Sequence, residues 1–112
     1  MSKNKAKGTA EETLVTNYLN DNGILAMRNP PQGAKDKGDI NLVSIPVVIE
    51  VKNHARMELA SWLDEANTEK FNAGAEIGVV WHKRARKGSP GQHYVTLDGE
   101  SFLVLLKKAF PV

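Results

Sequence analysis

The sequence has 112 residues, of which 41% are hydrophobic and 25% charged, so we expect a single globular domain. It contains no cysteine, which excludes disulfides and thiolate chemistry and favours a reducing compartment. No apolar run is long enough to span a membrane, and no apolar stretch of a secretory signal follows the basic N-terminus MSKNKAKG. These features predict a cytoplasmic protein without a membrane partner.

In chain order, the pattern predicts a flexible basic arm over residues 1–8 and one domain over residues 9–112. Thr9 and Glu12 have the spacing of a capping box, which predicts a first helix from Thr9 to Asn22. Apolar periodicity and turn residues predict strands at 24–28, 39–43, 47–52, 76–81 and 93–97, helices at 57–71 and 102–108, and polar loops at 29–38 and 82–91. This order predicts an α/β fold with a central mixed β-sheet flanked by helices.

Charge is unevenly distributed along the chain, although the formal net charge is only +2. A group of four acids lies away from the basic groups, between Glu58 and Glu69. The basic residues form three groups: Lys3, Lys5 and Lys7; Lys35 and Lys37; and Lys83, Arg84, Arg86 and Lys87. Such grouping predicts one basic face, for which phosphate is a natural partner. A solvated surface with a disordered tail explains the same charges equally well.

The stretch GDINLVSIPVVIEVK, residues 38–52, is an apolar hairpin with charges at its two ends. With the turn at Ser44–Ile45, Asp39 lies opposite Glu50, and Glu50 and Lys52 share one face. Like charges opposite each other destabilise a sheet, so we expect a divalent cation to compensate. Mg²⁺ is the natural candidate because it binds carboxylates together with substrate phosphate. The alternative is that Lys52 only pairs with an acid at the strand end.

A cation at this hairpin suits the hydrolysis of phosphodiesters. Held by Asp39 and Glu50, it would polarise the phosphodiester and lower the pKa of a bound water. Lys52 would orient that water or neutralise charge in the transition state. The sequence has no His/Cys spacing of the kind that binds zinc.

These motifs resemble those of the PD-(D/E)xK nuclease superfamily and, within it, those of the archaeal-type and phage Holliday junction resolvases. The resemblance covers residues 7–52 through Lys7-Gly8-Thr9-Ala10-Glu11-Glu12, Asn22-Gly23-Ile24 to Arg28, the Pro/Gly-rich loop, Gly38-Asp39-Ile40 and Ile49-Glu50-Val51-Lys52. It implies a restriction-endonuclease-like sheet and a homodimer that cuts opposing strands of branched DNA. It also implies a bacterial cell or a phage-infected host.

The resemblance assigns roles to particular residues. Asp39 and Glu50 would bind Mg²⁺, or Mn²⁺ as its substitute, together with the backbone carbonyl of Val51. Lys52 would be the catalytic lysine, and Glu12 would complete the acidic cluster. The candidate DNA-binding residues are Lys7, Arg28, Gln32, Lys35, Lys37, Lys83, Arg84, Arg86 and Lys87.

The chain departs from the family pattern at two positions. Gly38 stands where the family usually has proline before the first aspartate. Gln32-Gly33 stands where archaeal members have Ser-Gly, and glutamine does not replace a catalytic hydroxyl in every role. Gln32 is therefore a candidate for binding DNA only.

Several residues have more than one interpretation. Glu12 has the family spacing, whereas Glu11 lies nearer the middle of the apolar stripe of the first helix, so either can be the helix carboxylate. His54 would follow Lys52 on the active face if the strand continued, but a surface position is favoured. Trp62 and Trp81 are expected in the core rather than as stacking platforms for bases.

The first hypothesis for the whole chain is a metal-dependent endodeoxyribonuclease, most specifically a Holliday junction resolvase. A nuclease for other branched or nicked DNA is the nearest alternative. A catalytically silent nucleic-acid-binding module of the same fold is the second alternative, and an interaction protein with incidental basic clusters is the third.

Overall fold

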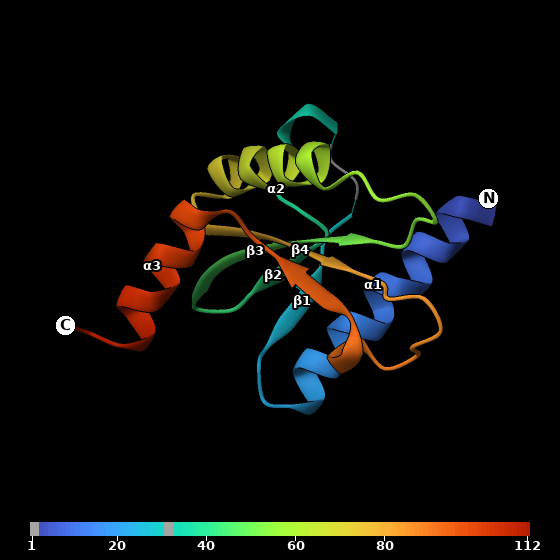
Figure 1. Ribbon diagram of the computed structural model, residues 1–112, viewed down its shortest axis with the longest axis horizontal. Helices are drawn as coiled ribbons and strands as arrows, with labels where there is room; N and C mark the ends of the chain where they lie inside the picture. Colours follow the sequence, from blue (N-terminus) through green and yellow to red (C-terminus); the bar gives the residue numbers. More distant parts are fainter. Residues whose placement is uncertain (1–2, 31–32) are drawn as a thin grey trace.

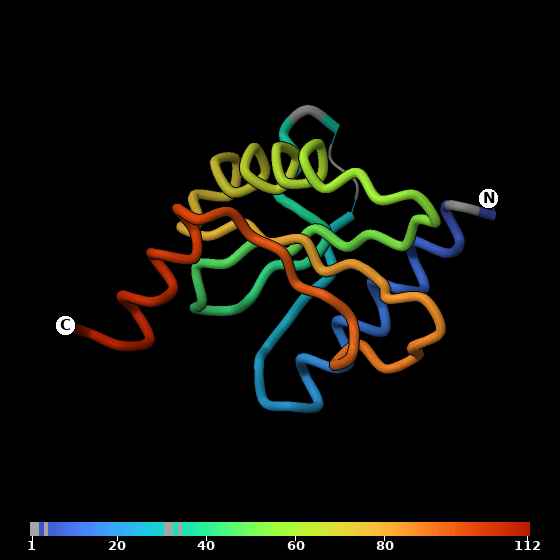
Figure 2. Tube along the Cα trace, viewed as in Figure 1, coloured from blue at the N-terminus to red at the C-terminus, as the bar shows by residue number. Residues whose placement is uncertain are grey.

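The computed structural model describes residues 3–30 and 33–112 of the chain. Its helices and strands are α1 (Lys3–Asp21), β1 (Ala26–Arg28), β2 (Ile40–Leu42), β3 (Ile45–Lys52), α2 (Leu59–Ala73), β4 (Ile77–His82), β5 (Tyr94–Thr96) and α3 (Gly99–Ala109). Within this part of the chain they form a five-stranded mixed sheet flanked by three helices (Figure 1, Figure 2). The predicted α/β class is thereby confirmed.

The strands lie in the sheet in the order of the sequence, from β1 to β5. All neighbouring pairs are antiparallel except β3 and β4, which are parallel. A parallel pair needs a crossover connection, and α2 provides it. The carboxyl ends of β3 and β4 therefore lie at the same edge of the sheet, where β3 ends in Lys52 and β4 in His82.

The two faces of the sheet carry separate apolar clusters. Val15 of α1 packs in the cluster that contains Ile49 of β3, whereas Trp62 and Ala66 of α2 pack with Val80 of β4. The predicted core position of Trp62 is confirmed, since its exposed fraction is 5%. Side chains alternate along a strand, so every second residue of β3, including the one after Ile49, faces α2.

The backbones of α2 and β4 approach each other closely at Gly78. A Cβ at this position would lie 2.7 Å from the carbonyl oxygen of Ala66, so only glycine fits without a shift of the helix. This contact fixes the position of α2 over β3 and β4, and the predicted site residues Glu50 and Lys52 lie on β3.

The first helix begins at Lys3, six residues earlier than the sequence predicted. Lys3 to Gly8, expected as part of a flexible arm, is helical, and Thr9 lies inside the helix rather than capping it. Lysine and alanine favour helices and carry the helix through this segment despite the single glycine. Glu12 is therefore not part of a capping box.

The hairpin turn also differs from the prediction. The turn residues are Val43 and Ser44, with Ser44 at φ +63°, and a β-bulge shifts the register between Asn41 and Leu42. Beyond the bulge Ile40 pairs with Ile49. Asp39 comes directly before β2, and its N–H donates to the Ile49 carbonyl at 3.1 Å, while its side chain and that of Glu50 line one cavity.

The third helix begins at Gly99, three residues before the predicted start, because Asp98 caps it. The side chain of Asp98 accepts a hydrogen bond from the Ser101 N–H at 2.8 Å. The helix extends away from the sheet toward the C-terminus (Figure 1). None of the helices in the described residues is long and apolar enough to cross a membrane.

Candidate metal centre and nucleic-acid interface

Asp39 is held in place at the start of β2 by the unusual backbone of Gly38. Gly38 has φ +93°, and a Cβ there would overlap the side chain of Val48, so neither proline nor alanine fits at this position. The Asp39 N–H donates to the Ile49 carbonyl at 3.1 Å, and Asp39 Oδ2 accepts from the Val51 N–H at 2.8 Å. These two bonds aim the carboxylate along the end of β3.

Glu50 and Lys52 project from β3 toward α2. Glu50 is 3% exposed, and Lys52 Nζ lies 3.2 Å from Glu50 Oε2. The same ammonium lies 2.8 Å from Glu65 Oε1 on α2. Burial alone would lower the pKa of Lys52, but the carboxylates of Glu65 and Glu50 outweigh it and raise this pKa, so the lysine stays charged.

The backbone of Val51 faces the same side as Asp39. The carbonyl of Lys52 accepts a hydrogen bond from the Lys83 N–H at 2.9 Å, on the β4 side of β3. Successive residues of a strand direct their backbone groups to opposite sides, so the carbonyl of Val51 points to the other side, where β2 has ended. An oxygen at this position could join Asp39 in holding a cation.

Glu12, and not Glu11, lies beside Asp39. Glu12 lines a cavity of about 430 Å³ together with Asp39, Glu50 and Lys52. Its Oε1 lies 3.2 Å from Arg28 Nη2. Burial and the neighbouring charge of Asp39 raise the pKa of Glu12, while the bond to Arg28 opposes this rise.

Glu11 points away from this cavity into a buried contact with His93. Its Oε1 lies 2.8 Å from His93 Nδ1, and His93 Nε2 lies 2.7 Å from the carbonyl oxygen of Lys87. The Glu11 Oε1 and His93 Nδ1 atoms are both buried and close, but they do not form a hydrogen bond of regular geometry. This contact joins α1 to the loop between β4 and β5.

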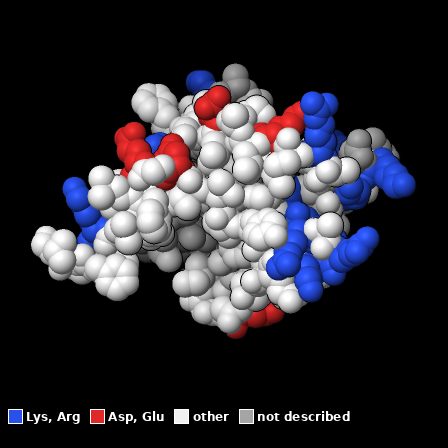
Figure 3. All heavy atoms as spheres, viewed as in Figure 1, with Lys and Arg blue, Asp and Glu red and all other residues white. Residues whose placement is uncertain are grey.

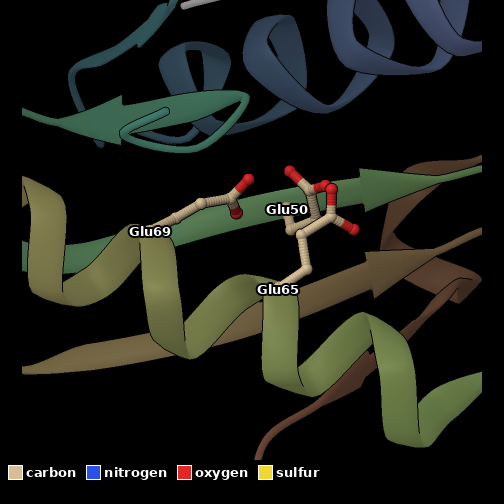
Figure 4. Close-up of side chains that lie close together, drawn as sticks. All are labelled: Glu50, Glu65 and Glu69. Carbon is tan, nitrogen blue, oxygen red and sulfur yellow. The ribbon is translucent and has the colours of Figure 1, made fainter. Parts of the chain in front are cut away.

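Two further acids, buried Glu69 and exposed Glu65, which the sequence reasoning missed, complete the acidic cluster. Glu65 and Glu69 of α2 approach Glu50, and one carboxylate oxygen from each of the three lies within 4.8 Å of the others (Figure 4). The sequence signal was the spacing: Trp62, Ala66 and Glu69 form one stripe at i, i+4 and i+7, so an acid lies on the apolar face of the helix.

The cluster is electrostatically unfavourable as long as all its acids are ionised. Burial raises the pKa of Glu69 to about 8, with help from the charges of Asp36 and Glu65. Burial, followed by the charge of Asp39, raises the pKa of Glu50, and burial raises that of Asp39 as well. Two ways exist to relieve this repulsion: bound protons or a bound cation.

The donor set suits a hard divalent cation. The atoms available are carboxylate oxygens and a backbone carbonyl, the ligands that Mg²⁺ and Mn²⁺ take in proteins. Glu50 Oε1 is buried and has no hydrogen-bond partner among the described residues, so one ligand atom is already directed into the cluster without a donor. Among the described residues, Glu50, Glu65 and Glu69 are the acids whose oxygens lie within 4.8 Å of one another, while Asp39, Glu12 and Val51 line the cavity that adjoins Glu50.

The predicted DNA-binding residues lie at several places around this site. Lys7 and Arg28 line the cavities next to Glu12, while Lys35 and Lys37 are exposed in the loop before β2. Gln32 lies outside the described residues. Lys83, Arg84 and Arg86 are exposed in the β4–β5 loop, and Lys87 is partly buried there.

One shallow cavity connects the acidic site to the β4–β5 loop. It has a volume of about 500 Å³ and is lined by Lys7, His54, Lys83 and Arg84, and Lys7 and His54 also line the cavity of the acidic site. Figure 3 shows Lys and Arg gathered at the end of the molecule where the N-terminus of α1 and this loop lie. A basic surface therefore borders the carboxylate cluster on one side.

Comparison with known proteins found no match: no family model fits the sequence, and neither the curated proteins nor the solved structures contain a significant similarity.

Proposed function

We propose that this protein is a Mg²⁺-dependent, structure-selective endodeoxyribonuclease, and more specifically a Holliday junction resolvase with a restriction-endonuclease-like fold. One observation carries the proposal: Asp39 and Glu50 line one cavity, with the Lys52 ammonium 3.2 Å from Glu50. Burial raises the pKa of both acids, and a basic surface borders them, which suits a cation and phosphate as ligands.

The roles of the residues follow from their positions. Asp39, Glu50 and the Val51 carbonyl would hold Mg²⁺, with Mn²⁺ as a substitute and Glu12 at the rim. When bound, the cation supplies Lewis-acid activation of the phosphodiester and of a water. Lys52, charged and held by two carboxylates, stabilises negative charge that develops on the phosphoryl oxygens.

The basic residues would bind the DNA backbone around this centre. Lys7 and Arg28 border the cavity itself, so they are suited to the phosphates next to the cut. Lys83 and Arg84 lie further out and are suited to phosphates of a second arm of branched DNA. Such contacts fix the position of the DNA without reading its sequence.

The proposal includes a homodimer through α3. The side of α3 opposite Val104 exposes large apolar residues, with Phe102 48% and Phe110 68% exposed. Glu100 and Lys107 lie on one flank of this face, so an antiparallel second copy of α3 brings Glu100 of each copy beside Lys107 of the other. The molecular mass in solution measures this, and a monomeric mass would remove the dimer from the proposal without touching the metal centre.

The test is cleavage of a synthetic four-way junction beside a matched linear duplex, with Mg²⁺ and with EDTA. We expect symmetric nicking of the junction in Mg²⁺ only, and a loss of rate of at least about a hundredfold in Glu50→Ala. Asp64→Asn, which removes an exposed acid from the same helix that carries Glu65, is the matched control and should cut normally.

Each other outcome points to a different function. Equal cutting of the junction and the duplex would keep the nuclease and discard the resolvase. Tight binding of DNA with no cutting in any divalent cation would favour the catalytically silent module of the same fold. Cutting that survives both EDTA and Glu50→Ala would show that the activity does not belong to this site.

A further inference from the structure

Glu69 is a buried acid whose side-chain neighbours are other carboxyl groups. It is 2% exposed, and neither of its carboxylate oxygens receives a hydrogen bond from any donor among the described residues. A buried carboxylate with no cation and no donor is strongly unfavourable, and native proteins retain few such groups. A shift of α2 does not bring Glu69 out to solvent, because the backbone of Ala66, one turn earlier, packs closely against Gly78.

The side chain of Glu69 points toward two other acids. The nearest oxygens of Glu50, Glu65 and Glu69 lie within 4.8 Å of one another, between β3 and the facing turns of α2 (Figure 4). Lys52 neutralises only part of this group: its ammonium reaches Glu65 Oε1 and Glu50 Oε2. Glu50 Oε1 and both oxygens of Glu69 remain without a donor.

We propose that Glu50, Glu65 and Glu69 form a second site for a divalent cation, distinct from the one at Asp39, with Glu50 shared by both. Hard cations such as Mg²⁺, Mn²⁺ and Ca²⁺ bind oxygen at about 2.0–2.6 Å, so oxygens on opposite sides of one ion lie about 4–5 Å apart. The observed spacing falls within this range. The site stands on its geometry, and its use in DNA cleavage rests on the proposed nuclease function.

One other arrangement satisfies the same side chains. A proton on Glu50 would let it donate to Glu69, which removes one charge and supplies one hydrogen bond. The remaining Glu69 oxygen would still lack a donor, whereas a cation contacts several oxygens at once. The number of cations bound by the protein distinguishes the two arrangements.

The experiment counts Mn²⁺ bound to the full chain, without DNA, by electron paramagnetic resonance of the free ion. We expect two ions for the wild type, one for Glu69→Gln and one for Asp39→Asn. Glu69→Gln keeps the size of the side chain and removes its charge, and we expect at least a tenfold loss of affinity at the second site. Asp64→Asn, an exposed change on the same helix, should still bind two ions.

The other outcomes separate this inference from the proposed function. A single ion that is lost in Asp39→Asn and kept in Glu69→Gln would overturn the second site and leave the proposed nuclease intact. A single ion that is lost in Glu69→Gln and kept in Asp39→Asn would support the second site and contradict the proposed catalytic one. No bound ion at all would overturn both. Metal-free melting shows that Glu69→Gln folds, since removing the unpaired charge should leave its melting temperature equal or higher.

Discussion

Glu11 and Glu69 are both almost completely buried, at 1% and 2% exposed, and both lie on helices that pack against the same sheet. Their surroundings differ. Glu11 faces the imidazole of His93 at 2.8 Å, and that ring also contacts the carbonyl of Lys87. Glu69 faces Glu50 and Glu65, and no donor among the described residues reaches it.

The different surroundings of the two acids indicate different roles: Glu11 contributes to the packing of the fold, whereas Glu69 does not. Glu11 lies 2.8 Å from an imidazole nitrogen and thereby connects α1 to the β4–β5 loop, so its neighbour is not another acid. Glu69 adds only repulsion to the metal-free protein. A buried charge without a compensating contact in the protein is typical of a binding site. A bound ligand is then expected to supply the missing contact.

The largest effect is expected when the partner of Glu11 is removed. His93→Leu leaves the buried Glu11 carboxyl group without its neighbouring imidazole, which should lower the free energy of unfolding by about 3–5 kcal/mol. Urea denaturation at neutral pH measures this. The double variant Glu11→Gln with His93→Leu should recover part of the loss, because no buried charge remains. A cost below about 1 kcal/mol in the single variant would mean that the pair is not a structural one.

An effect of opposite sign and comparable size is expected for Glu69, the acid that faces other acids. The pKa of Glu69, raised by burial to about 8 from an ordinary 4.5, means that the folded protein binds more protons than the unfolded chain between these pH values. The metal-free free energy of unfolding should therefore fall as pH rises from 4.5 to about 8, by at most about 1.4 kcal/mol per pH unit for each proton.

The matched variants test this slope. In EDTA, the free energy of unfolding of Glu69→Gln should fall less steeply with pH than that of the wild type. Near pH 8 the variant should be more stable than the wild type. Asp64→Asn, whose carboxylate is exposed, should follow the wild type. A wild-type stability that rises across this interval would show that Glu69 is ionised and compensated in the folded protein.

The same contrast explains what the sequence could and could not predict. The meeting of Asp39 and Glu50 was predictable because strand alternation and an apolar hairpin allow few registers, and the bulge at Asn41 compensates for the misplaced turn. The contribution of Glu69 was not predicted because an acid in a helix is usually solvated, although its stripe with Trp62 and Ala66 pointed inward.

Two other features depended on contacts that are distant in the sequence. The choice between Glu11 and Glu12 is decided in the structure by His93, which lies more than eighty residues further on and pairs with Glu11. The helical Lys3–Gly8 segment was missed because glycine at position 8 and the charges of the tail resemble an arm, whereas α1 is already helical from Lys3.

The smallest effect on the fold is expected at the β4–β5 loop, which the Glu11–His93 contact holds against α1. Arg84→Ala with Arg86→Ala removes two exposed charges and should leave stability unchanged, because His93 still contacts Lys87. Binding of DNA should weaken for all sequences, and the slope of log affinity against log salt should shrink by about 2.

Lys108→Ala, at the far end of α3, is the control and should leave the slope unchanged. If the double variant binds DNA as tightly as the wild type at low salt, this loop does not contact phosphate, and its contact with Glu11 through His93 serves the fold alone.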